Sequence, residues 1–181
     1  SDAGTGRWLI VSKWIADAAT EEDRSEGYPQ LLREHHEWTA GHAGRLADRL
    51  NLSAEYRGLL VLAARLHDEG KASAKWQRAF NAKKDGVYAK TRGPLNVALL
   101  DGYRHELGSI LSAGVRNQLN DLPDDLRDLA YHLIASHHGF ARPLIRARGC
   151  DLPPSRLEDE TRHVALRYLR LQKRWGPWGL A

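Results

Sequence analysis

Apolar side chains recur at spacings of three and four residues through most of this chain, whereas the alternation typical of strands is scarce. The stretch PQLLREHHEWTAGHAGRLADRLNL, which starts at Pro29, carries one such stripe along a helix. Gly70 and Gly139 supply the expected ends of two later helices. Ser155 with Glu158 has the form of a capping box at the start of the last one. The pattern predicts an all-α fold, a compact helical bundle.

The remaining helices follow from the same stripes. One begins at Ser53, which can cap it, and another covers about residues 94–119. A further helix runs from Asp124 to the sequence SHHG. Segments 72–93 and 140–154 are expected to be connecting loops.

The length of 181 residues is enough for one sizeable core, so residues 1–181 are expected to form a single domain. With 42% hydrophobic and 28% charged residues, the composition is that of a globular protein rather than a disordered one. No apolar run reaches the roughly 20 residues of a membrane span, and the N-terminal stretch WLIVSKWIADAA is expected to be a buried helix or strand. The single cysteine, Cys150, excludes an internal disulfide and fits a reducing cytoplasm.

The positive charge of the chain is concentrated near its C-terminus. Nine basic and four acidic side chains lie beyond Gly139, an excess of five, against a net charge of +4 for the whole sequence. A basic surface of this kind attracts polyanions such as nucleic acids. Any one of these arginines can equally belong to a solvated helix face.

Five histidines and one aspartate fall on the apolar stripes or at the helix ends beside them. Helical bundles build metal sites from side chains on facing helices. A single histidine on such a stripe is more often a core residue whose ring nitrogens form hydrogen bonds. Five rings buried in one small domain are costly without partners, and a divalent metal held by imidazole and carboxylate is such a partner. The set is His35, His67, Asp68, His105, His137 and His138.

The other histidines are assigned to different roles. His42 lies seven residues from His35, about 10 Å along the helix axis, and is expected to be a core residue rather than a ligand. His132 and His163 fall off the apolar stripes and are expected to be exposed. His36 neighbours His35 and is a candidate to contact the ligands without binding the metal itself.

Four motifs in order, EHHEWTAGHA, LHDEGKASAKWQ, YRHELG and ASHHG, resemble the HD superfamily of metal-dependent phosphohydrolases. More narrowly, they are similar to the HD nuclease domain of the helicase-nuclease of type I CRISPR interference. A His-Asp pair alone is a weak signal, whereas four motifs in the right order on helices are a strong one. The resemblance implies an HD-type bundle with a metal site at its centre, as a fragment or subunit of a larger helicase-nuclease.

The same resemblance implies that the six residues of the set are metal ligands and that Asp68 bridges two divalent ions. The ions are of the group Mn, Fe, Co, Ni, Zn or Mg. His35 is preferred to His36 as the ligand because of its spacing to the following Thr39 and Ala40. The family pattern also has a final aspartate in a helix after the basic segment, and this sequence has none in that context.

The predicted chemistry is in-line hydrolysis of a DNA phosphodiester, in which two ions activate water and clamp the reacting oxygens. Asp68 and Lys71 are the catalytic candidates. Lys71 would neutralise a non-bridging phosphate oxygen. In the alternative interpretation, Lys71 is a lysine that interacts favourably with the dipole at a helix C-terminus.

Five further residues are candidates for contacts with nucleic acid. Arg142, Arg146 and Arg148 directly follow the His-His-Gly turn, which would place them at the mouth of the site. Lys75 and Trp76 could contact the backbone and stack on a base. An aromatic residue after a helix end more often fills a core, and that interpretation is the favoured one for Trp76.

Three functions are open on the sequence alone. The first is a nuclease for single-stranded DNA in antiviral CRISPR interference, cytoplasmic, with a helicase domain or subunit and the surveillance complex as partners. The second is an HD phosphohydrolase that acts on small nucleotides. The third is a catalytically impaired HD module that binds nucleic acid, which the lack of a matching final aspartate favours.

Overall fold

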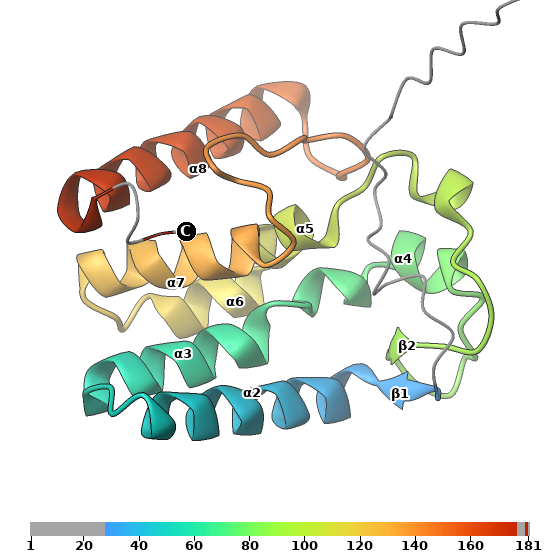
Figure 1. Ribbon diagram of the computed structural model, residues 1–181. Coiled ribbons are helices and arrows are strands. Elements are labelled where there is room, and N and C mark those ends of the chain that lie inside the picture. The colour runs from blue at the N-terminus through green and yellow to red at the C-terminus, as the bar shows by residue number, and fades with distance from the viewer. Residues whose placement is uncertain (1–27, 177–179, 181) are drawn as a thin grey trace, which may run out of the picture.

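The computed structural model describes residues 28–176 and 180 of the chain, and the stretch WLIVSKWIADAA lies outside them. The described part is mostly helical, which confirms the all-α class (Figure 1). A minor antiparallel sheet pairs Gln30 with Lys90 and Leu31 with Tyr88. The elements are β1 (Gln30–Leu31), α2 (Leu32–Arg49), α3 (Ala54–Leu66), the 3-10 helix η1 (Glu69–Ala72), α4 (Ala74–Ala79), β2 (Tyr88–Lys90), the 3-10 helix η2 (Val97–Leu100), α5 (His105–Leu111), α6 (Ala113–Leu119), α7 (Asp124–Ser136) and α8 (Pro154–Trp175).

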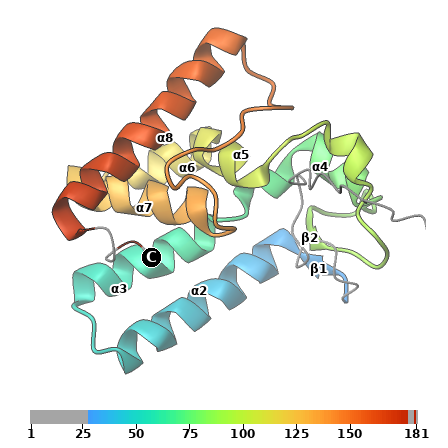
Figure 2. The same cartoon turned by 45° about the horizontal axis from the view of Figure 1, so that its top comes forward.

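The long helices are stacked side by side. In both views α3 lies between α2 and α7, and α8 covers the far side of α7 (Figures 1 and 2). The short helix α5 packs against both α7 and η1, so it reaches from the bundle to the turn that follows α3. The ends of α3, α5 and α7 therefore meet in one region. Within the described residues, we find no helix with the length and apolar character that a membrane crossing requires.

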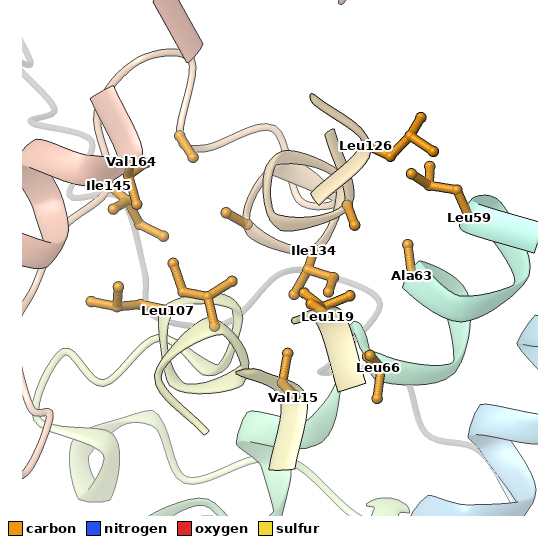
Figure 3. Packing of buried hydrophobic residues seen from close by; sticks show 14 residues of the cluster. Leu59, Ala63, Leu66, Leu107, Val115, Leu119, Leu126, Ile134, Ile145 and Val164 are labelled. Carbon is orange, nitrogen blue, oxygen red and sulfur yellow. The ribbon is translucent and has the colours of Figure 1, made fainter. Parts of the chain in front are cut away.

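The main core lies where α3, α5, α6 and α7 converge, with α8 closing one side (Figure 3). A second, smaller cluster lies under α4 and η2, around Trp76 and Leu100. The residues labelled in the main cluster are Leu59, Ala63, Leu66, Leu107, Val115, Leu119, Leu126, Ile134, Ile145 and Val164.

Helix α2 buries a different face from the one that its large apolar residues predict. Trp38 is 59% exposed and Leu46 is exposed as well. His42 is exposed beside Trp38, with ring centroids 4.2 Å apart, so its assignment to the core is wrong. Apart from Leu32, the buried line consists of small residues and the two histidines. The small residues are there because α3 packs closely along α2: a Cβ built at Gly44 would lie 3.4 Å from the side chains of Arg57 and Val61.

The segment 94–119 is not one helix. It forms η2, α5 and α6, because Asp101 and Gly102 adopt left-handed backbone angles (φ 49° and 74°) and Ser112 is extended. This break makes His105 the first residue of α5. The expected loop 72–93 is also wrong, since it contains α4 and β2, whereas 140–153 is irregular as expected.

The helix ends agree with the sequence in part. Gly139 has a φ of 81° and donates to the Ser136 carbonyl, as a glycine after a helix should. Helix α3, however, ends at Leu66, four residues before Gly70. Helix α8 starts at Pro154, and in the described structure no side chain caps it, so the capping box predicted for Ser155 is wrong.

His132 is buried, contrary to the expected exposure, whereas His163 is exposed as expected. The His132 ring lies between α7 and α8, 5.6 Å from the ring of Tyr168. Burial, followed by the positive charges of Arg142 and Arg167, lowers the pKa of His132 to about 4. The folded protein therefore holds this imidazole neutral at a pH where an unfolded chain would protonate it.

This shift predicts an acid-sensitive fold. Because the pKa of His132 is near 6.5 when unfolded and about 4 when folded, its contribution is fully present above pH 6.5 and is lost as the pH falls toward 4. At about 1.4 kcal/mol for each pH unit, the loss is about 3 kcal/mol. Urea unfolding with EDTA at pH 7 and pH 4 should show that acid lowers the free energy of unfolding less in His132→Phe than in the wild type. The exposed His163→Phe is the control. An equal fall in the free energy of unfolding between pH 7 and pH 4 in all three proteins would contradict the prediction.

Candidate metal centre

Asp68 lies at the centre of the histidine cluster. It follows His67, the C-cap of α3, is 1% exposed, and directly precedes η1. Its Oδ2 lies 3.2 Å from Nε2 of His35 and 3.4 Å from Nε2 of His67. Its Oδ1 lies 3.1 Å from Nε2 of His105 and 3.6 Å from Nε2 of His137. One carboxylate therefore faces two groups of imidazoles.

These side chains form two sets that share Asp68. In each set, the candidate ligand atoms lie within 4.8 Å of one another. The six residues come from α2, the end of α3, the start of α5 and the end of α7, so the fold brings together all of the predicted ligands. Their role as ligands stays a prediction. The sets are His35, His67 and Asp68, and Asp68, His105, His137 and His138.

Three imidazoles are held by acceptors on the side away from Asp68. Nδ1 of His67 lies 2.7 Å from the Ala64 carbonyl, and Nδ1 of His137 lies 2.7 Å from the Ile134 carbonyl. Both histidines are the C-caps of their helices, where the last carbonyls are open to such bonds. Since a carbonyl only accepts, each Nδ1 carries the proton and each Nε2 presents a lone pair to the site.

His35 is held in the same way, by a side chain. Its Nδ1 lies 3.0 Å from Oε1 of Gln30, at the start of the small sheet. Metal-bound histidines characteristically donate their second ring nitrogen to a carbonyl or carboxylate, which fixes the ring orientation. The contacts of His35 have this form.

The ring nitrogens and the carboxylate oxygen at the centre would repel one another without a positive charge between them. Nε2 of His105 lies 3.2 Å from Nε2 of both His137 and His138. Asp68 Oδ1 is buried and accepts no hydrogen bond from the described residues. Lone pairs and a carboxylate crowded in this way fit a divalent cation, and nitrogen with oxygen ligands suits the first-row metals. The donor set is therefore compatible with a bound metal ion.

The charges of the centre are consistent with this fit. Burial would raise the pKa of Asp68, but Lys71 and His67 hold it well below its ordinary value, so the carboxylate is ionised. Burial and the charge of Lys71 lower the pKa of His105, which keeps that ring neutral. Burial also opposes protonation of His137, yet the Asp68 carboxylate raises its pKa. The Asp68 carboxylate thus favours a positive charge beside it, whether a proton on His137 or a metal ion.

Lys71 belongs to the centre rather than to the surface. It is buried, its Nζ lies 2.9 Å from Asp68 Oδ2, and it stands 5.7 Å from the centroid of the Trp76 ring. His36 is also buried, and its ring centroid lies 6.1 Å from that of His67. His36 is in neither ligand set.

The candidate nucleic-acid contacts divide into two groups. Arg142, Arg146 and Arg148 are exposed on the segment that follows α7. Lys75 is half-buried and donates to the Gly149 carbonyl at 2.8 Å, which ties that segment to α4.

Trp76 is a core residue, so its candidate role in stacking on a base is wrong. Its ring is 0% exposed and packs edge-on against His105, with centroids 4.6 Å apart. No face of the indole is open to a base. Trp76 instead packs behind the ring of the candidate ligand His105, as the favoured interpretation of the sequence holds.

Sequence reasoning missed the contacts that lock α5 to the turn after α3. Gly70 N donates to Oγ of Ser109 at 2.8 Å, and the Ser109 hydroxyl lies 2.7 Å from the His67 carbonyl. Arg104 and Glu106 flank His105 and are both buried. The pattern RHELGS contains Arg104, Glu106 and Ser109. A buried ion pair and a serine that hydrogen-bonds to a neighbouring turn, however, produce no periodic pattern in the sequence.

Comparison with protein families identifies one match, to the family described as Cas3, HD domain, over residues 14–178. The searches of curated proteins and of solved structures found no match. The match spans every residue of both ligand sets.

Proposed function

The chain belongs to the Cas3 HD-domain family, and on that premise we propose that it hydrolyses phosphodiester bonds in single-stranded DNA. Family membership carries the coarser function, that of a metal-dependent nuclease of CRISPR defence. The observation that supports the proposal is the pair of ligand sets that share the buried Asp68. Divalent ions held by these two sets would supply activation of water and stabilisation of the charge that develops on the phosphate.

Each side chain has a distinct part in this proposal. Asp68 directs one oxygen toward each set, so it would contribute a ligand atom to an ion in either set. Lys71 stands beside Oδ2 of Asp68 and would neutralise a non-bridging phosphate oxygen. Arg142, Arg146 and Arg148 would contact the DNA backbone, because exposed arginines on a basic surface bind phosphates. Trp76 has no place among these contacts.

The proposal includes the setting in which the domain works. We infer a helicase domain or subunit and the CRISPR surveillance complex as its partners, in the cytoplasm. All six candidate ligands of the centre come from this chain.

The proposal is tested with the purified chain and four substrate classes. Labelled single-stranded DNA, duplex DNA of the same sequence, nucleoside triphosphates and cyclic nucleotides are incubated with Mn²⁺, Ni²⁺ or Mg²⁺, or with EDTA. We expect cleavage of the single strand with at least one metal and none with EDTA. Hydrolysis of small nucleotides alone would support the phosphohydrolase instead. Binding of DNA without cleavage under any of these conditions would support the impaired module.

A further inference from the structure

His105 differs from His35, His67 and His137 in what lies behind its ring. His67 and His137 donate Nδ1 to backbone carbonyls, and His35 donates to an amide oxygen. Nδ1 of His105 is buried and has no hydrogen-bond partner among the described residues. The nearest carboxylate oxygen is Oε2 of Glu106, at 3.7 Å.

Glu106 shows the matching anomaly. It is 0% exposed, and within the described structure its Oε2 also lacks a hydrogen-bond partner. The other oxygen, Oε1, is taken by Arg104 Nη2 at 2.5 Å. An unpaired carboxylate oxygen in a protein interior is costly, so a buried acceptor and a buried donor that face each other call for a common explanation.

Arg104 fixes the Glu106 carboxylate in this place. Its guanidinium stacks on the ring of Phe140, 3.5 Å from the centroid, while it holds Oε1. Phe140 follows the His137 and His138 turn, so the same contact connects the ends of α5 and α7. Trp76 packs against His105 from another side. A small rotation of the His105 ring is the motion that would shorten the 3.7 Å gap to Oε2.

We propose that Glu106 is a positioning residue of the metal centre, which accepts the Nδ1 proton of His105 and so presents the Nε2 lone pair to the ion. The inference rests on the proposed function only in treating His105 as a metal ligand. Carboxylate behind histidine also makes the ring a stronger electron donor than a carbonyl does. His105 is thereby a stronger imidazole donor than His137, whose Nδ1 donates to a carbonyl.

Glu106→Gln and Glu106→Ala test this role, with Glu160→Gln as the matched control. Glu160 accepts from Arg116 at 2.7 Å, so the control removes the same charge from an arginine pair away from the centre. Calorimetric titration with Mn²⁺ should show affinity reduced about 10- to 100-fold in Glu106→Ala and about 10-fold in Glu106→Gln. Affinity in Glu160→Gln should equal that of the wild type. If Glu106→Ala does not fold, wild-type affinity in the isosteric Glu106→Gln overturns the proposal by itself.

A second measurement separates positioning from a structural role. In nitrogen-15 spectra of the metal-free protein, the His105 proton should lie on Nδ1 in the wild type and shift toward Nε2 in Glu106→Ala. An unchanged tautomer together with unchanged affinity would refute the role of Glu106. Both measurements are made without DNA, so a wild-type protein that cleaves no DNA refutes the proposed function and leaves this inference standing.

Discussion

Replacement of Asp68 by asparagine is expected to abolish DNA cleavage, with a loss of about a thousand-fold or more, because several kcal/mol of transition-state stabilisation depend on the ions. One carboxylate faces both ligand sets, one oxygen to each. The asparagine keeps the shape but removes the charge, and its amide nitrogen would point a donor at one set. Binding of Mn²⁺, measured by calorimetry, should fall in parallel with cleavage of single-stranded DNA.

The control for this variant is Asp128→Asn. Asp128 accepts two hydrogen bonds from Arg170 between α7 and α8, so the same chemical change is made outside the centre. Asp68→Asn also removes the carboxylate that lies 2.9 Å from Nζ of the buried Lys71, which destabilises the fold. The double variant with Lys71→Met removes this cost and should still fail to bind the metal. Wild-type Mn²⁺ affinity in Asp68→Asn or in the double variant would contradict the assignment of Asp68.

The part of the centre that could be predicted from the sequence is the part that depends on helix ends. His67 and His137 close apolar stripes, and a stripe fixes which face of a helix points inward. The ring of a C-cap histidine can reach the carbonyl three residues before it, so its orientation follows from local structure. These rings converge because the stripes that carry them pack against one core.

The sequence was less informative where packing opposes hydrophobicity. In α2 the close approach of α3 selects Ala40, Gly44 and Ala47 for the interior and leaves Trp38 outside. The large apolar residue Trp38 therefore predicts the wrong face of this helix. The exposure predicted for His132 is wrong for a related reason. Its burial depends on the position of α8, which contacts α7 but lies far from it in the sequence.

The contact between the turn after α3 and the helix α5 makes the second large prediction, for Gly70→Ala. A Cβ at this position would lie 2.1 Å from the His105 carbonyl oxygen and 2.8 Å from the Ser109 backbone nitrogen. Both are backbone atoms, so no side chain can move to make room. We expect a loss of about 3–5 kcal/mol in the free energy of unfolding, at the upper end for a single overpacking substitution. Urea denaturation of the metal-free protein measures it.

The clash should also reach the metal centre, because the atom that the new methyl group meets belongs to a candidate ligand. Moving α5 away from η1 would break the bond from Gly70 N to Ser109 and carry His105 away from Asp68. Gly58→Ala is the control, since a Cβ in that part of α3 meets nothing within 4 Å among the described residues. There the same substitution should stabilise the protein by up to about 1 kcal/mol through helix propensity. Opposite signs at the two glycines would show that close backbone contact, and not the glycine-to-alanine change itself, holds His105 against Asp68, whereas equal effects would refute it.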